Sequence, residues 1–187
     1  MHSTPKREEI RQIYRELNQN ARSLLVERID LATLTLKDIG PDAIRCAMAW
    51  RLAYSATNAH KMPGWDWHLE WKKARGRPRL VQLAIWDEQK LYALAIGRVS
   101  KGRINATLHF IEADPWKDSN LPKAGKIFAR YLEAVGYLAR CREIILDRPN
   151  KNLIEYYKEL GFTELHKAKG EKGREYLKWV LNDNYAA

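Results

Sequence analysis

The chain has 187 residues, 45% of them hydrophobic and 30% charged, which is the size and composition of one globular domain with its own core. Its first eleven residues are polar, and no stretch approaches the roughly 20 apolar residues of a bilayer span, so we expect a cytoplasmic protein with no membrane partner. The net charge of +10 leaves the fold open and favours anionic ligands such as a phosphorylated cofactor, nucleic acid or an acidic protein, with a solvated basic surface as the alternative.

The first predicted element is one long helix, Lys6–Ile29. Pro5 suits the first turn, and Glu8 and Glu9 favour the positive end of the helix dipole. Apolar residues recur at helical spacing and form one face: Ile10, Ile13, Leu17, Ala21, Leu24 and Leu25. A helix of this length, about 36 Å, either packs across the core or forms a contact in a homodimer, and we expect core packing.

A strand and two helices come next. Leu31–Leu36 alternates and carries β-branched residues, which is typical of a short strand. Helices are expected at Pro41–Asn58, where the proline suits the first turn, and at Gly64–Arg75. The basic loop Arg75–Arg79 then leads into the next strand.

The middle of the chain predicts an antiparallel meander of three strands, Leu80–Trp86, Leu91–Val99 and Ile104–Ala113. The remaining elements are a helix after Ser119–Pro122 that ends near Arg140, a strand at Glu143–Leu146, a helix at Asn152–Leu160, and a strand pair at Phe162–Leu165 and Glu175–Leu181. The sequence therefore predicts a mixed α/β chain.

The two cysteines, Cys46 and Cys141, each lie in an apolar segment. Buried free thiols explain them better than a disulfide or a metal site, because a metal site needs more ligands at short spacing. We expect no metal and a reducing compartment.

Two segments share residue types and spacing with a known family. Leu108–Pro115 is a strand that ends in Asp-Pro before a loop and a helix, and Asn150–Phe162 reads as an Asn, a helix and then Tyr-x-x-x-Gly-Phe. With the order of elements, these segments resemble the GNAT acyltransferase superfamily. The resemblance implies a mixed, mostly antiparallel central sheet flanked by helices, formed by residues 31–187, with residues 1–30 as a helical extension.

The resemblance also implies acetyl-CoA, or another acyl-CoA, as cofactor. The family's pyrophosphate loop reads Gln/Arg-x-x-Gly-x-Gly/Ala; here Asn120, Lys123 and Gly125 take the three positions, and only Gly125 matches. Helix N-termini bind phosphate well, and the implied cofactor-binding set is Ile111, Ala113, Asn120, Lys123, Ala124, Gly125, Lys126 and Asn150. A GNAT-like shell that has lost its cofactor is the alternative, but the positive loop favours binding.

The implied chemistry is direct attack of a substrate amine on the acyl thioester. An alkylamine with a pKa of about 10.4 must first lose a proton, and Glu112 or Asp114, on one face of the strand, could accept it. Glu112 is our candidate base, because Asp114 is expected to organise the turn; an ordinary strand-end carboxylate is the alternative. Tyr157 lies at the family's usual position for the acid that protonates the leaving thiolate.

The family builds its acceptor pocket from the early helices, here the region Asn58–Trp71. Trp65, Trp67 and His68 are the candidate substrate-binding residues, because an aromatic cluster can clasp a flat or cationic group; core packing is the alternative. His60 and His68 are candidates for proton transfer or ordinary histidines.

We therefore expect a GNAT-type N-acetyltransferase that acts on an unidentified amine. One alternative is a catalytically degenerate module that binds nucleic acid or an acidic protein partner through its positive face. Another is a GNAT-type enzyme that modifies a nucleic acid or tRNA. The basic loop Arg75–Arg79, close in sequence to several tryptophans, motivates the nucleic acid.

Overall fold

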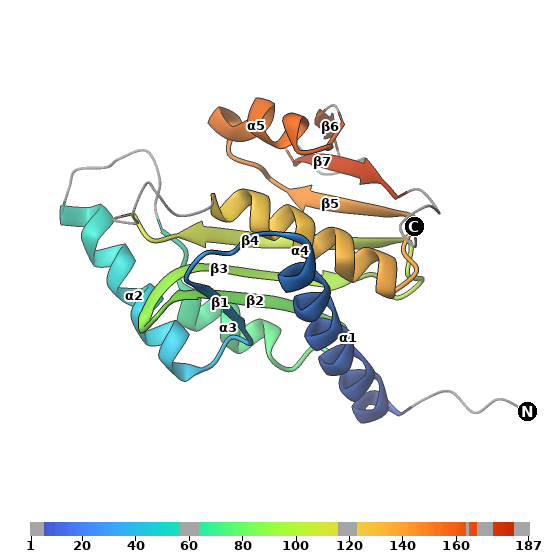
Figure 1. Cartoon of the computed structure of the whole chain (residues 1–187), viewed down its shortest axis with the longest axis horizontal. Coiled ribbons are helices and arrows are strands. Elements are labelled where there is room, and N and C mark those ends of the chain that lie inside the picture. Colours follow the sequence, from blue (N-terminus) through green and yellow to red (C-terminus); the bar gives the residue numbers. More distant parts are fainter. Residues whose placement is uncertain (1–5, 57–63, 116–122, 164, 168–173, 182–187) are drawn as a thin grey trace, which may run out of the picture.

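The computed structural model describes residues 6–56 (the backbone alone for 51–56), 64–115, 123–163, 165–167 and 174–181, and shows one sheet with helices on both faces (Figure 1). Its strands lie in the order β1-β2-β3-β4-β5-β7-β6 in one 7-stranded sheet. All neighbouring strands are antiparallel except β4 and β5, which are parallel. The predicted mixed, mostly antiparallel sheet is confirmed.

The elements follow the predicted order. The strands are β1 (Leu34–Lys37), β2 (Leu80–Asp87), β3 (Lys90–Val99), β4 (Asn105–Ala113), β5 (Glu143–Asp147), β6 (Leu165–Lys167) and β7 (Glu175–Val180). The helices are α1 (Arg7–Arg28), α2 (Pro41–Ala56), α3 (Trp67–Ala74), α4 (Ala124–Leu138) and α5 (Ile154–Glu159), with a 3-10 turn η1 (Lys151–Leu153) before α5.

The first and the second-to-last predicted strands are shifted in the structure. β1 begins at Leu34 instead of Leu31, because Ala32 adopts the left-handed φ of 51° of a turn. β6 begins at Leu165 instead of Phe162, because the Phe162 ring is buried in the core next to α5. Both shifts come from turn geometry and packing that local alternation does not reveal.

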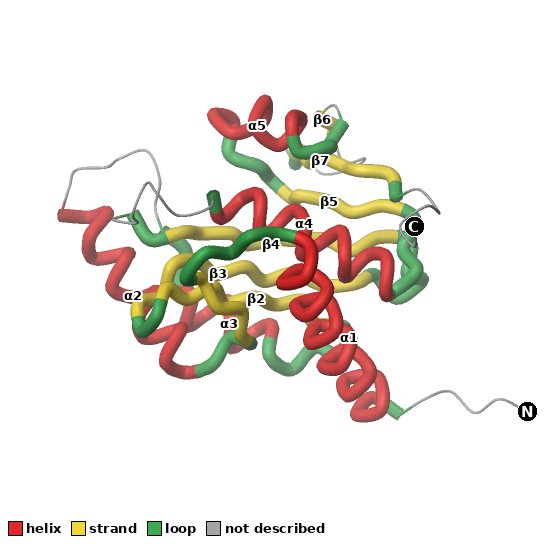
Figure 2. The backbone as a smooth tube through the Cα atoms, viewed as in Figure 1, coloured by secondary structure: helices red, strands yellow, loops and turns green. Residues whose placement is uncertain are grey.

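Helix α1 packs on the sheet beside α4 (Figures 1 and 2). Its buried stripe contains Tyr14, Ala21 and Leu25, which share one core cluster with α4 and the central strands. Core packing of this helix is therefore confirmed. Ile13 was expected on the apolar face but is 49% exposed, because the buried stripe runs beside it.

Helices α2 and α3 cover the opposite face of the sheet, where a second core cluster forms around Trp50, Trp67, Leu94 and Ile96. Both cysteines are free thiols; Cys141 is buried, as predicted, whereas Cys46 is only partly buried. Burial raises the pKa of Cys141 to about 11. Within the described ranges, no helix combines the length and apolar character that crossing a membrane requires.

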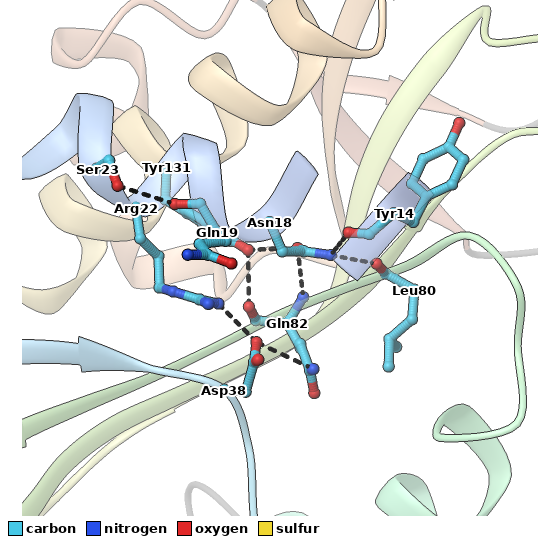
Figure 3. A network of polar contacts seen from close by, with 9 residues as sticks. All are labelled: Tyr14, Asn18, Gln19, Arg22, Ser23, Asp38, Leu80, Gln82 and Tyr131. Atoms are coloured by element: carbon cyan, nitrogen blue, oxygen red, sulfur yellow. Dashed lines mark hydrogen bonds and ion pairs between the residues drawn. The ribbon is translucent and has the colours of Figure 1, made fainter. Parts of the chain in front are cut away.

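A buried polar network ties α1 to the edge of β2 (Figure 3). The pairing of β1 with β2 stops at Ala84, so the earlier part of β2 pairs with β3 on one side and has no described strand on the other. Asn18, only 3% exposed, covers this edge. Its amide donates to Leu80 C=O at 2.9 Å and accepts from Gln82 N–H at 3.4 Å.

Tyr131 of α4 completes the same network. Its hydroxyl group lies 2.7 Å from Gln82 C=O and 2.5 Å from the side-chain oxygen of Asn18, with both oxygens as acceptors. Burial raises the pKa of Tyr131, so the phenol stays a donor. Because an unsatisfied buried backbone group is costly, the side chains of two helices here replace a neighbouring strand.

We predict that Asn18→Leu lowers the free energy of unfolding by about 2–4 kcal/mol, because it keeps the size of the side chain and leaves backbone groups of β2 unpaired. Urea unfolding followed by circular dichroism measures the change. Asn20→Leu is the matched control: it changes an exposed asparagine on the same helix and is expected to cost less than about 0.5 kcal/mol. Equal losses in the two variants would contradict the role of Asn18.

Candidate functional site

The candidate site is centred on the part of β4 that has no described strand on one side. β4 pairs with β5 only over residues 105–108, opposite residues 143–146, and then continues to Ala113. On the other side, the backbone N–H of Asp114 donates to Tyr92 C=O in β3 at 2.8 Å. Hydrogen bonding alternates along a strand, so the backbone groups of Ile111 and Ala113 point to the edge that β5 does not cover.

A bulge marks the point where β4 leaves β5. Ile96 pairs with Phe110 while Gly97 pairs with Leu108, so His109 is the extra residue. A side chain at Gly97 would place its Cβ 2.0 Å from the Thr107 carbonyl oxygen, so only glycine permits this close approach. Bulges bend a strand, and this bend accompanies the separation of β4 from β5.

Glu112 lies on the β4 face that carries Phe110, under the segment that opens α3. Its carboxylate accepts a hydrogen bond from the indole N–H of Trp67 at 2.5 Å and another from the backbone N–H of Trp65 at 3.2 Å. Burial raises the pKa of Glu112, and these two donors only partly offset the effect. A carboxylate with a raised pKa is a stronger base than an exposed one.

The three predicted substrate-binding residues lie in different surroundings. Trp67 is fully buried in the second core cluster, so its indole positions Glu112 from inside the core. Trp65 is 38% exposed, and its ring stands edge-on to Phe110 with centroids 4.8 Å apart. His68 is exposed on α3. Of the three, Trp65 is the one that offers an aromatic surface beside Glu112.

The N-terminus of α4 is electropositive. The helix begins after Lys123, its first turn contains no acidic residue, and the side chain of Lys123 makes no capping hydrogen bond. Lys123 and Lys126 are both exposed, and the ammonium group of Lys123 lies 5.3 Å from the ring centre of Tyr156. These features, with the helix dipole, favour an anion. Asn120 and the rest of the predicted pyrophosphate loop up to residue 122 lie outside the described residues. His60 lies outside them as well.

Gly125 has a structural reason to be glycine. A Cβ at this position would lie 2.8 Å from the Tyr156 ring, so the ring occupies the space that a side chain would need. The buried hydroxyl group of Tyr156 makes no hydrogen bond within the described part of the chain. Burial raises the pKa of this phenol, and the nearby backbone N–H of Lys126 partly opposes the effect. The α4 N-terminus therefore borders the buried hydroxyl group of Tyr156.

Tyr157, the predicted acid, lies next in the chain but is packed in the core. It is 6% exposed and stands edge-on to Phe162, with centroids 6.1 Å apart. Burial, reinforced by Tyr156, raises its pKa to about 12, so the phenol carries its proton at neutral pH. Asn150, predicted to hold the cofactor, accepts a hydrogen bond from the Asn152 backbone N–H at 3.0 Å and so caps η1.

Sequence reasoning missed a charged cluster at the point where β4 and β5 separate. The carboxylate of Asp147, the last residue of β5, accepts from His109 Nδ1 at 3.0 Å and from Arg174 Nε at 2.9 Å. His109 Nε2 is buried and has no partner in the described part of the chain. Burial alone would raise the pKa of Asp147, but its hydrogen bonds to His109 and Arg174 prevail and lower it to about 2.

Asp114 lies apart from this cluster. It is 1% exposed and forms an ion pair with Lys90 of β3 at 2.8 Å. An open depression of about 480 Å³ borders it, lined by Cys46, Ala49, Trp50, Gln89, Lys90, Leu91 and Asp114. This depression includes neither Glu112 nor Tyr157. Among the described residues, no three side chains that could ligate a metal are grouped together.

Comparison with known proteins reveals a shared fold. No protein-family model and no curated protein matches the chain. An acetyltransferase of Streptococcus agalactiae superposes with a TM-score of 0.59 at 14% identity, over 80% of this chain and 99% of that one. A chimeric spermidine N-acetyltransferase of Vibrio cholerae gives 0.57 at 16%, over 80% and 96%. The PaiA N-acetyltransferase of Thermoplasma acidophilum, in complex with coenzyme A, gives 0.55 at 12%, over 79% and 99%.

The low pKa of Asp147 predicts a pH dependence of stability. Because the folded pKa of about 2 lies below the ordinary value of 3.8, the carboxylate stabilises the fold above about pH 4 and loses this effect as the pH falls toward 2. We expect Asp147→Asn to remove about 1–2 kcal/mol at pH 6 and much less near pH 2.5, measured by urea unfolding. An equal loss at both pH values would show that charge is not the cause.

Proposed function

We propose that this chain, which has the fold of the GNAT acetyltransferases, is an acyl-CoA-dependent N-acyltransferase that transfers an acyl group, most simply acetyl, to an amine. One observation carries the proposal: in the middle of the sheet, β4 leaves the backbone groups of Ile111 and Ala113 without a described strand on one side. Such an edge suits an extended ligand that contains amide groups.

The residues present fit an acyl-CoA. The pyrophosphate would be held at the N-terminus of α4, by backbone N–H groups of Ala124 and Gly125 and by the charges of Lys123 and Lys126. When bound, the cofactor would supply an activated acyl thioester. The backbone N–H groups of Ile111 or Ala113 would donate to the oxygen of a carbonyl group at this edge and stabilise negative charge there.

Glu112 is the proposed base. A protonated alkylamine cannot attack a carbonyl carbon, and its pKa of about 10.4 keeps it protonated at neutral pH. The raised pKa of Glu112 suits a group that accepts a proton near neutral pH. Trp65, half-exposed beside the carboxylate, would contact the carbon chain or ring that bears the amine.

Tyr157 is the proposed acid. With a pKa of about 12, the phenol of Tyr157 keeps its proton at neutral pH. It can donate this proton to a leaving thiolate, because burial disfavours the charged thiolate and makes it a stronger base. Its hydroxyl group makes no hydrogen bond to another described residue. Tyr156 is the alternative candidate for the acid, because it is next to Tyr157 in the chain and its ring lies against Gly125 at the start of α4.

A second function has a specific observation in its favour. Gly125 is explained by packing against Tyr156 alone, so the one match to the family's loop does not by itself require a cofactor. With the net charge of +10, a catalytically degenerate module that binds nucleic acid or an acidic protein would show the same features.

Calorimetric titration with acetyl-CoA and with CoA tests the proposal. We expect saturable binding in the micromolar range, followed by acyl transfer in a screen of amines that includes basic peptides and tRNA. Gly125→Val should weaken binding at least tenfold, whereas Gly102→Val, in an exposed turn where a Cβ meets only ordinary contacts, should not. The absence of any binding heat would contradict the enzyme and favour the non-catalytic module.

Tyr157→Phe tests the acid. We expect kcat to fall at least tenfold while the calorimetric Kd of CoA changes less than threefold, because the hydroxyl group acts on the leaving thiolate alone. Tyr156→Phe removes the adjacent hydroxyl group and serves as the matched control, with kcat close to that of the wild type. The reverse pattern would assign the acid to Tyr156, and unchanged turnover in both would remove this role from α5.

A further inference from the structure

The end of the sheet opposite the candidate site lies on the right of Figure 1, and its loops are rich in basic residues. There β2, β4 and β5 begin and β3 ends, and the loops at these strand ends come together. We call this surface the basic end, and its residues are Arg75, Arg77, Arg79, Arg98, Lys101, Arg103, Arg140 and Arg142. Most of these side chains are exposed, and none of them forms an ion pair with a carboxylate of a described residue.

Helix α1 fixes one of these loops. The guanidinium groups of Arg7 and Arg11 donate to the backbone carbonyl of Gly76 at 2.9 and 2.7 Å. The basic loop is therefore attached to the start of α1. The charges of Arg79 and Arg103 both reach the hydroxyl group of Tyr14, where they lower its pKa against the larger, raising effect of burial. Arginines from separate loops thus share one region of space.

Two of the arginines occupy strained backbone positions. Arg103 and Arg140 have φ values of 54° and 56°, in the left-handed region that glycine adopts without cost. A residue with a Cβ costs roughly 1–2 kcal/mol there. Both side chains are exposed, so packing does not offset this cost. Both arginines therefore carry their charge on exposed turns of the basic end.

The geometry points to a nucleic acid as the partner. Four adjacent strands at a spacing of about 4.8 Å carry these loops over about 14 Å, which is comparable to the roughly 12 Å width of the DNA major groove. Seven of the eight side chains are arginines, whose guanidinium groups match phosphate oxygens in pairs. We propose that the basic end binds the phosphate backbone of double-stranded nucleic acid, independently of sequence.

A duplex fits this surface better than a single strand. Proteins that hold single strands stack the bases on exposed aromatic side chains. Among the described residues, Trp65 is the large aromatic side chain that is exposed, and it lies beside Glu112 at the other end of the sheet. Within the described ranges, the basic end therefore offers charge without an exposed aromatic residue for stacking.

Fluorescence anisotropy with a labelled RNA duplex of about 20 base pairs, and with a DNA duplex of the same sequence, tests the proposal. Arg103→Gly/Arg140→Gly removes two charges and relieves the backbone, so the variant should remain folded. We expect it to bind either duplex at least tenfold more weakly, with a slope of log K against log salt reduced by about 2. Arg45→Gln/Lys158→Gln removes two charges from α2 and α5 as the matched control, and its affinity should change less than threefold.

Three results would overturn the proposal: no duplex binding by the wild type at low salt, equal losses in the two double variants, or competition by poly-glutamate that matches competition by unlabelled RNA. Binding of both duplexes supports backbone recognition, and a difference between them identifies the preferred helix. The basic end is distant from the candidate acyl-transfer site, so acetyl-CoA affinity should be unchanged in Arg103→Gly/Arg140→Gly. Loss of duplex binding is therefore separable from failure of the proposed enzyme activity.

Discussion

The backbone N–H and C=O groups of a sheet must find partners, and this chain treats two incomplete strand edges in opposite ways. Beside β2, where β1 ends, Asn18 and Tyr131 supply the missing partners from two helices. Beside β4, the pairing with β5 ends at Leu108, and no described strand lies beside Ile111 or Ala113 on that side. The first edge anchors the N-terminal helix, and the second is available to a ligand.

The electrostatics follow the same division. At the end of the sheet where β4 leaves β5, the N-terminus of α4 is positive, and two carboxylates have opposite shifts: the pKa of Glu112 is raised by burial, and that of Asp147 is lowered by its hydrogen bonds. One suits proton transfer, and the other fixes His109 in place. At the opposite end, arginines dominate. The two ends of one sheet thus present a candidate reaction site and a separate basic surface.

The fold was largely predictable because it depends on local signals. Periodicity located α1 and the meander, and the spacing from Tyr157 to Gly161 located the late helix. The details of the site were less predictable. The bulge at His109 depends on pairing with β3, and the hydrogen bond between Asp147 and Arg174 joins residues 27 positions apart, so neither follows from local sequence. The burial of Trp67 was also not predictable, because the sequence alone does not show whether a tryptophan in a helix contacts a substrate or the core.

The central claim is that the free edge of β4 is the binding edge for acyl-CoA. Residue-resolved amide hydrogen exchange by NMR, with and without saturating CoA, tests it most directly. We expect exchange at Ile111 and Ala113 to slow at least tenfold, whereas Asp114, already bonded to β3, serves as the internal reference and stays unchanged. Unchanged exchange at Ile111 and Ala113, with CoA bound elsewhere or not bound, would contradict the account.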